Sequence, residues 1–233
     1  RKISNLEGGL AAFYTLDYQP RFGRSAVALG DVNGDGITDL AVGAPGDDDG
    51  GTYAGAVYVL FMNVTVIGAQ KISNLHGGLS AFYTLGMNDF FGNSLAALGD
   101  WNGDGIPDMA VGAYGDDDGS SGAGAVYIIF LNSDGTAGNM TKISNSHGGL
   151  SSFYTLGSSS YFGCSIATIG DLNSNGAYAI NELSLNMNQM EGTLPTQLGR
   201  LTALRMLNLQ HNRVSGTMPT ELTNLTQLQV LYT

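Results

Sequence analysis

Oxygen-bearing side chains alternate with other residues in two short segments, D-V-N-G-D-G-I-T-D at residues 31–39 and D-W-N-G-D-G-I-P-D at residues 100–108. Ca²⁺ binds about six to eight oxygens from carboxylates, amides, backbone carbonyls and water, and alternate positions of a tight loop can point to one centre. The sequence therefore predicts one calcium site in each segment. The expected ligands are Asp31, Asn33, Asp35, the carbonyl of Ile37 and Asp39 in the first, and Asp100, Asn102, Asp104, the carbonyl of Ile106 and Asp108 in the second.

Carboxylates at this density oppose folding when no cation lies between them. Two carboxylates about 5 Å apart repel by roughly 3 kcal/mol at an effective dielectric of about 20. Asp-Gly and Asn-Gly pairs also form ordinary turns, which is the simpler interpretation of a single segment. Two segments with the same spacing of oxygen ligands favour metal binding. A third segment at residues 171–179 has only one carboxylate, Asp171, and ends on Ala179, so weak or no calcium binding is expected there.

The spacing matches the first half of an EF-hand loop, but the rest of that motif is missing. An EF-hand has a bidentate glutamate at its twelfth position and helices on both sides. That position is Val42 in the first segment and Val111 in the second. Strand-like runs flank the first segment, S-A-V-A-L-G at 25–30 and D-L-A-V-G-A-P at 39–45. An EF-hand is therefore excluded.

Both segments belong to a longer internal repeat, which gives the first indication of the fold. K-I-S-N begins at residues 2, 71 and 142, and a Phe-Gly pair follows each copy, at Phe22, Phe91 and Phe162. Each full repeat has three apolar strand-like runs, and a fourth, weaker strand is expected near A-Q-K-I-S or A-F-Y-T-L. Four short strands with tight turns predict one antiparallel sheet, and sheets repeated radially form propeller blades.

The repeat changes abruptly near Asn175, inside the third copy of the loop. A gap in the sequence, or a junction between two sources, is an open alternative at this point. The new period is 24 residues, within the range of leucine-rich repeats. We expect its leucines to point inward and its asparagine to hydrogen-bond the backbone of the turn. The recurring positions are Leu185 and Leu209, Asn188 and Asn212, Gly192 and Gly216, and Pro195 and Pro219.

Residues 1–176 resemble FG-GAP repeats, the blade units of integrin-alpha-like β-propellers. The resemblance lies in the Phe-Gly pairs, the oxygen-rich loops and Gly43-Ala44-Pro45, although the second copy has Tyr114 in place of the proline. It covers two nearly full repeats and a partial third, and it implies that the loop joins two strands of a blade and binds calcium. Residues 177–233 resemble about two plant-type leucine-rich repeats, L-x-L-x-x-N-x-x-x-G-x-x-P. The expected fold is mainly β, with four-stranded antiparallel blades of an incomplete propeller followed by a short solenoid.

Composition excludes several classes of partner and location. The formal net charge is −11, which argues against a nucleic-acid partner because phosphate binding needs a basic surface. No apolar run approaches the roughly 20 residues that span a bilayer, so no membrane span is expected. Cys164 is the only cysteine, so an internal disulfide is impossible. The sequence begins at Arg1 inside a repeat, and we take it to be a mature chain or a fragment.

Three glycosylation sequons favour secretion, at Asn63, Asn139 and Asn224. Catalytic motifs such as H-E-x-x-H or a nucleophile elbow are missing, and an enzyme is not expected. His76 and His147 occupy the repeat position of Glu7, which fits a surface role better than catalysis.

Other recurring residues have structural interpretations. The G-D-D-D-G runs at residues 46–50 and 115–119 are expected to be solvated acidic loops, with a second cation site or a ligand-facing rim as alternatives. Cys164 is expected to be a small buried thiol, with an intermolecular bond as the alternative. The repeating tyrosines are expected to pack within blades; they are Tyr14, Tyr58, Tyr83, Tyr127 and Tyr154.

Together these features predict an extracellular calcium-binding repeat protein that acts in adhesion, recognition or scaffold assembly. Propeller faces and solenoid surfaces are broad platforms for protein or glycan partners, and copies of the chain or neighbouring chains would complete the propeller. Two alternatives remain open: a structural subunit of an extracellular filament or coat, and the non-catalytic part of a larger secreted hydrolase.

Overall fold

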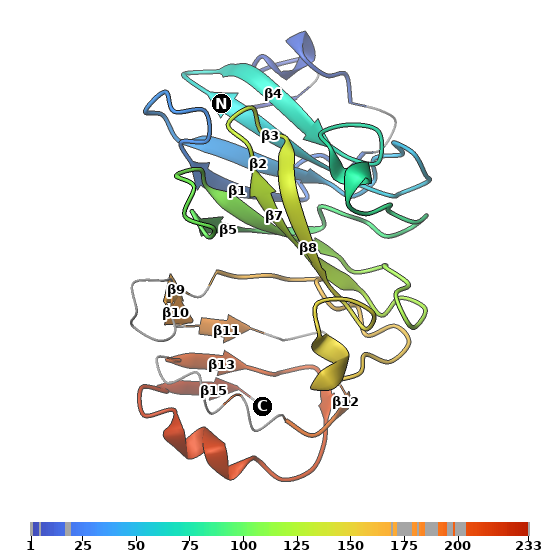
Figure 1. The fold of residues 1–233 in the computed structure, drawn as a ribbon, viewed down its shortest axis with the longest axis vertical. Helices are drawn as coiled ribbons and strands as arrows, with labels where there is room; N and C mark the ends of the chain where they lie inside the picture. Colours follow the sequence, from blue (N-terminus) through green and yellow to red (C-terminus); the bar gives the residue numbers. More distant parts are fainter. Residues whose placement is uncertain are drawn as a thin grey trace.

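The computed structural model describes residues 2–4, 6–16, 20–168, 170–171, 179–180, 182–184, 191–194, 198 and 204–232. In this part of the chain the regular elements are β-strands and short 3₁₀ turns. Two four-stranded sheets pack one above the other, and the leucine-rich segment continues along the long axis of the molecule (Figure 1). The mainly β fold predicted from the sequence is confirmed.

Each full repeat forms one antiparallel four-stranded sheet, here called a blade. The first blade contains β1 (Ser25–Gly30), β2 (Asp39–Ala44), β3 (Ala56–Met62) and β4 (Val66–Ile72), in that order. The second blade repeats this order with β5 (Ser94–Gly99), β6 (Asp108–Ala113), β7 (Ala125–Leu131) and β8 (Ala137–Ile143).

The fourth strand covers A-Q-K-I of the repeat, so the first of the two expected positions is confirmed. The A-F-Y-T-L segment instead begins at the end of a single 3₁₀ turn and continues without regular structure. The three copies of this turn are η1 (Leu10–Ala12), η2 (Leu79–Ala81) and η3 (Leu150–Ser152).

Alternation along the strands places apolar side chains on both faces of a blade. In β3, Val57 and Val59 belong to the core that the two blades share, whereas Tyr58 and Leu60 pack on the opposite face. All four side chains are buried, because successive residues of a strand point to opposite faces and both faces are covered. The expected role of the repeating tyrosines in packing is confirmed for Tyr58 and Tyr127.

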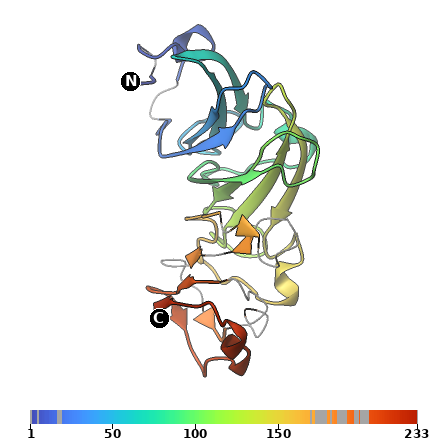
Figure 2. The same ribbon diagram turned by 90° about the vertical axis from the view of Figure 1, so that its left-hand side faces the viewer.

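The Phe-Gly pair forms the joint between consecutive blades. Phe91 is fully buried in the shared core, and its backbone N–H donates to the carbonyl of Ala54 in the first blade at 3.0 Å. A parallel bridge links Gly55 with Phe91, and another links Gly124 with Phe162. Strand β1 also packs against β5, so the first strands of the blades lie side by side (Figures 1 and 2).

The glycine of this pair is required by close approach as well as by backbone conformation. Gly92 has a φ of 87°, and a Cβ at this position would lie 2.4 Å from the carbonyl oxygen of Ala56. Gly163 repeats the arrangement against Ala125 at 2.3 Å. Gly23 has nearly the same φ, 85°, but no heavy atom of the described residues lies within 4 Å of its Cβ position. Among the described residues, Gly23 therefore has no contact equivalent to the one that Gly92 makes with the first blade.

The third repeat starts a further blade in the same way. Thr168 donates a hydrogen bond to the carbonyl of Ala97 at 2.7 Å. Two-residue strands β9 (Gly170–Asp171) and β10 (Ala179–Ile180) then pair antiparallel.

The leucine-rich segment forms a parallel sheet of β11 (Glu182–Ser184), β13 (Met206–Asn208) and β15 (Val230–Tyr232). A second pair of strands consists of β12 (Glu191–Gly192) and β14 (Arg213–Val214). The 3₁₀ turn η5 (Thr220–Asn224) precedes β15. Glu182 pairs with Met206, and Met206 with Val230, so the register reproduces the 24-residue period. Asn212 donates to the carbonyl of Leu209 at 2.8 Å, which confirms the expected turn contact for this copy. Leu185 and Asn188 lie outside the described residues, as does the proposed boundary between 176 and 177, which stays a prediction.

Candidate metal loops and a buried ionic network

The first candidate calcium loop connects β1 and β2, and Asp31 organises its backbone. One carboxylate oxygen of Asp31 accepts N–H bonds from Gly34 at 2.7 Å and Asp35 at 3.0 Å, and the other accepts from Gly36 at 2.7 Å. Gly36 has a φ of 85°, as expected for a sharp turn at this position. The loop therefore closes around the carboxylate at its first position.

The remaining expected ligands divide into two groups. Asn33 donates a side-chain hydrogen bond to Asp35 at 3.1 Å, so these side chains lie near each other at the exposed end of the loop. The amide of Ile37 donates to Asp35 at 2.8 Å. Asp39 is instead fully buried, and its two oxygens accept N–H bonds from Val32 and from Met62 in β3, both at 2.9 Å. Asp39 thus ties the loop to the middle of the blade.

The second loop, between β5 and β6, reproduces this arrangement. Asp100 accepts from Gly103 at 2.7 Å, Asp104 at 3.0 Å and Gly105 at 2.9 Å. Asn102 donates to Asp104 at 2.8 Å, and the amide of Ile106 also donates to Asp104.

Asp108 closes the second loop as Asp39 closes the first. It is fully buried and accepts from Trp101 at 2.9 Å and Leu131 at 3.1 Å. Burial raises the pKa of the Asp108 carboxyl despite these backbone hydrogen bonds, which act in the opposite direction.

The donor set of both loops fits a hard divalent cation. Every expected ligand is an oxygen, and a carboxylate oxygen that accepts one N–H keeps a further lone pair for a metal. In the described part of the chain, however, no group of three or more His, Cys, Asp and Glu side chains is gathered closely enough to hold a metal ion. The loop carboxylates are directed to backbone amides instead. The ligand assignments therefore stay predictions.

The third loop is only partly described. Asp171 and Ala179 pair through their backbones in β9 and β10. Asn173 and Asn175 lie outside the described residues, so the expected weakness of this site stays a prediction. The three sequon asparagines, Asn63, Asn139 and Asn224, are all exposed, which permits glycosylation without testing it.

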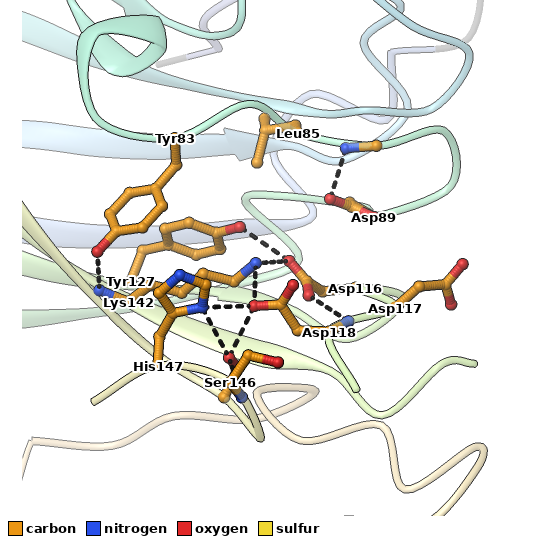
Figure 3. Close-up of polar contacts among 12 residues, drawn as sticks. Tyr83, Leu85, Asp89, Asp116, Asp117, Asp118, Tyr127, Lys142, Ser146 and His147 are labelled. Atoms are coloured by element: carbon orange, nitrogen blue, oxygen red, sulfur yellow. Dashed lines mark hydrogen bonds and ion pairs between the residues drawn. The ribbon is translucent and has the colours of Figure 1, made fainter. Parts of the chain in front are cut away.

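A buried ionic network joins each G-D-D-D-G run to the last strand of its blade. In the second blade, the Nζ atom of Lys142 lies 2.7 Å from Asp116 and 2.8 Å from Asp118 (Figure 3). The Tyr127 hydroxyl donates to Asp116 at 2.8 Å. His147 contacts Asp118 at 2.8 Å through Nδ1. We call these five residues the second network.

The first blade contains the same network with different residue numbers. Lys71 lies 2.8 Å from Asp47 and 2.7 Å from Asp49, the Tyr58 hydroxyl donates to Asp47 at 2.9 Å, and His76 contacts Asp49 at 2.8 Å. Asp47 and Asp116 are almost completely buried, at 0% and 2% exposure. The interpretation of these runs as solvated loops is therefore wrong for their first aspartates. It holds for Asp48 and Asp117, which are exposed.

The electrostatics of the second network favour its charged state. Burial by itself lowers the pKa of Lys142, but hydrogen bonds and charges of Asp116 and Asp118 outweigh burial and raise it. Burial likewise opposes ionisation of Asp118, yet Lys142 and Ser144 lower its pKa overall. Such a network stabilises the joint between the acidic loop and β8 only while both signs of charge are present.

Sequence reasoning missed these networks, although a signal was present. The lysine of K-I-S-N recurs with every repeat, at 24 residues after Asp47 and at 26 after Asp116. His76 and His147 have half-exposed side chains bound to one aspartate each, in agreement with the surface role expected for them.

Asp89 lies near the second network, at the entry to the second blade (Figure 3). Its carboxylate is 5% exposed and accepts the N–H of Gly86 at 2.7 Å. Burial, followed by the charge of Asp116, raises the pKa of Asp89 to about 6. The charge of Asp116 thus acts on Asp89 as well as on Lys142.

Comparison with known proteins identifies both parts of the chain. The FG-GAP repeat family matches residues 22–60 and 91–129, and the Leucine Rich Repeat family matches residues 203–225. The chain therefore contains two FG-GAP repeats, followed by a leucine-rich-repeat segment.

Among individual relatives, integrin alpha-M of Mus musculus is 41% identical over 95 residues, 41% of this chain and 8% of the relative. Integrin alpha-X of Homo sapiens is 42% identical over 96 residues, again 41% of this chain and 8% of the relative. Phosphatidylinositol-glycan-specific phospholipase D of Bos taurus is 34% identical over 140 residues, 57% of this chain and 16% of the relative. The chain thus spans a small part of the length of these proteins. No helix of the described residues is long and apolar enough to cross a bilayer.

Proposed function

We propose that the chain is an extracellular, calcium-stabilised repeat protein without catalytic activity that acts in adhesion, recognition or scaffold assembly through protein or glycan partners. The observation that carries this proposal is the repeated loop. Two loops with the same oxygen donors connect the first two strands of successive blades, and each ends on a buried aspartate bonded to the third strand. Similarity to integrin alpha chains supports the adhesive role.

Calcium in these loops would act as a structural clip. The ligands would be Asp31, Asn33, Asp35, Asp39 and the Ile37 carbonyl, with their counterparts Asp100, Asn102, Asp104, Asp108 and the Ile106 carbonyl in the second blade. The positive charge of the cation would offset the repulsion among the clustered carboxylates. At a calcium concentration of about ten times the dissociation constant, each site adds about 1.4 kcal/mol to the free energy of unfolding.

Trp101 provides a direct test because it is the only tryptophan and lies at the second position of the second loop. Its side chain is 59% exposed, and its amide binds Asp108. We expect calcium titration in the range of about 0.1–1 mM, typical of extracellular modules, to change its fluorescence. Asp104→Asn should abolish this response, whereas Asp35→Asn, the same change in the first loop, should preserve it.

An unchanged melting temperature with calcium and after chelation, together with a flat fluorescence titration, would contradict the calcium assignment. A response of Trp101 that survives Asp104→Asn would place the cation elsewhere. Circular dichroism of each variant serves as the control, because it shows that a lost calcium response does not result from unfolding.

Assembly with other chains is the second element of the proposal. No described residue lies within 4 Å of a Cβ at Gly23, whereas the equivalent Gly92 packs against Ala56 of the preceding blade. A neighbouring blade from another part of the full protein, or from a second copy, would cover Gly23.

Similarity to the phospholipase D favours a different setting, in which these blades are the non-catalytic part of a larger secreted hydrolase. Determining the full-length chain by intact mass of the native protein would distinguish these settings.

A further inference from the structure

An open groove lies where strands β1 and β5 begin, next to the equivalent residues 164–166 of the third repeat. It has a volume of about 710 Å³ and includes Arg21, Arg24, Asn93, Tyr114, Tyr161 and Ser165 among its lining residues; we call it the arginine groove. Ligand sites for small molecules typically measure about 300–1,000 Å³. The groove therefore has the size of a small-ligand site and is separate from both metal loops.

The charge of the groove is opposite to that of the chain. The formal net charge is −11, yet the lining includes two arginines and no aspartate or glutamate. Within the described residues, Arg21 and Arg24 form no ion pair, whereas Lys71 and Lys142 are each held by two carboxylates. In an acidic chain, two arginines of one groove that pair with no carboxylate of the described residues form a local site for an anion.

Several polar groups around the arginines already form hydrogen bonds within the protein. Ser25 donates to the carbonyl of Gly92 at 2.8 Å, and Ser94 donates to that of Gly163 at 2.7 Å. The Asn93 side chain accepts from Nε of Arg24 at 3.2 Å and donates to the carbonyl of Cys164 at 3.0 Å. No described residue accepts a hydrogen bond from the terminal guanidinium nitrogens of Arg21 and Arg24. These strong donors match the planar oxygen pair of a carboxylate or the oxygens of a sulfate.

One wall of the groove is aromatic. Tyr114 stacks on Phe90 with ring centroids 4.9 Å apart and planes at 1°, and Tyr161 meets Tyr114 edge-on at 5.7 Å. The guanidinium of Arg21 lies over the rings of Tyr53 and Phe90, at 5.5 and 5.7 Å. Cation–π contacts with Tyr53 and Phe90 thus hold Arg21 in place. The half-buried rings of Tyr114 and Tyr161 provide apolar surface for a ligand in the same groove.

The residue before each Phe-Gly pair has the same backbone conformation in all three repeats. Arg21, Phe90 and Tyr161 each precede a Phe-Gly pair and have φ values of 54°, 55° and 52°. Hydrogen bonds from the preceding blade hold two of them, Phe90 to Tyr53 at 3.0 Å and Tyr161 to Gly122 at 3.1 Å. A left-handed conformation is unfavourable for such large residues and persists only when the surrounding structure imposes it. Three successive repeats therefore direct a large side chain to the groove or its wall.

We propose that the arginine groove binds an anionic saccharide, with the guanidinium groups of Arg21 and Arg24 holding its carboxylate or sulfate and the tyrosine rings packing against the sugar. A pyranose ring has an apolar C–H face and acidic substituents at its edge, which matches an aromatic wall beside two donors. A peptide is less suited, because Ser25 and Ser94 already occupy the carbonyls of Gly92 and Gly163. This inference names a ligand class for the recognition role proposed above.

Titration calorimetry with four probes of equal length tests the ligand class: a uronic-acid oligosaccharide, a sulfated oligosaccharide, a neutral oligosaccharide and an oligoglutamate peptide. We expect one or both anionic saccharides to bind and to weaken with added salt, while the neutral sugar and the peptide do not bind. The uronate and sulfate arms then distinguish the two acidic groups. Equal binding of the neutral sugar, or stronger binding of the peptide, would overturn the proposal.

Variants test the location of the site. Arg24→Gln and Arg21→Gln should each weaken binding roughly tenfold, or about 1.4 kcal/mol. Arg205→Gln removes the same charge from an exposed residue of the leucine-rich segment and should have no effect. Ser165→Asp places a carboxylate at an exposed groove position and should abolish binding without changing the melting temperature. Unchanged affinity in both groove arginine variants and in Ser165→Asp would refute the assignment.

Measurements with and without calcium separate the two proposals. If the loops do not bind calcium, chelation leaves both stability and saccharide binding unchanged, and the groove assignment survives. If the groove does not bind saccharide, calcium still changes Trp101 fluorescence. Sedimentation of the groove variants adds one outcome: if they dissociate an oligomer and bind no sugar in any state, the groove is an interface between copies and the proposal is wrong.

Discussion

Replacing Asp116 by asparagine removes one charge from the second network and changes almost nothing in side-chain size. Asp116 is 2% exposed and receives three hydrogen bonds, from Lys142 at 2.7 Å and Tyr127 at 2.8 Å on one oxygen and from the amide of Asp118 at 3.0 Å on the other. Asparagine has only one acceptor oxygen, so its NH₂ group must face one of these donors. At least one buried donor is left without its acceptor in the variant.

The expected loss of stability follows from the surroundings of this carboxylate. Removing one partner of a buried ion pair costs about 3–5 kcal/mol. Two features place the value at the lower end: Asp118 still pairs with Lys142, and the repulsion between Asp116 and Asp89 disappears. We therefore expect Asp116→Asn to lower the free energy of unfolding by about 3 kcal/mol. For a chain of this size that corresponds to a fall in melting temperature of about 6–12 °C.

Urea denaturation at pH 7, followed by circular dichroism, measures this change, and Asp117→Asn is the matched control. Asp117 is the next residue in the same acidic run, but it is exposed, and its single hydrogen bond from Gly122 can be kept by an amide oxygen. We expect the control to stay within about 0.5 kcal/mol of the parent protein. Equal effects of the two variants, or a loss below about 1 kcal/mol for Asp116→Asn, would refute the assignment of the network to the stability of the blade.

Three further predictions concern other parts of the blades. Because the pKa of Asp89 is raised from 3.8 to about 6, the folded state holds a proton that the unfolded state releases between these values, and stability falls as the pH rises through this window. Asp89→Asn should therefore stabilise the protein by at most about 3 kcal/mol at pH 7.5 and by little at pH 4, as measured by urea denaturation at both values; a pH-independent difference would contradict this. Gly23→Ala should lower the free energy of unfolding by about 1 kcal/mol because of the positive φ at this position. Gly92→Ala should lower it by about 1–3 kcal/mol more, because the added Cβ meets the carbonyl of Ala56. Equal melting temperatures of the two variants would contradict the role of Gly92 in the contact between the blades. With both loops loaded at about ten times their dissociation constants, calcium should raise the melting temperature by about 6–11 °C, and Asp35→Asn combined with Asp104→Asn should remove this increase.

Much of the local structure was predictable because it depends on short-range patterns. Apolar runs bounded by glycine placed β1 and β2 within a residue of their observed limits. The 24-residue period of the C-terminal segment matches the strand register, which pairs Glu182 with Met206 and Met206 with Val230. The Asp-Gly and Asn-Gly pairs also indicated tight turns; the structure shows in addition that Asp31 and Asp100 close them by accepting the amide hydrogens that follow.

Tertiary structure decided which distant charges meet. The sequence repeat begins at K-I-S-N, but the blade ends there, so Lys71 pairs with aspartates of the preceding copy and not of its own. The burial of Asp47 and Asp116, the raised pKa of Asp89 and the gathering of Arg21 and Arg24 in one groove likewise depend on how blades stack. Periodicity along a chain fixes which way a side chain points from its strand. The neighbours it meets, and hence its charge state and its chemistry, are fixed only when separate sheets pack and exclude water.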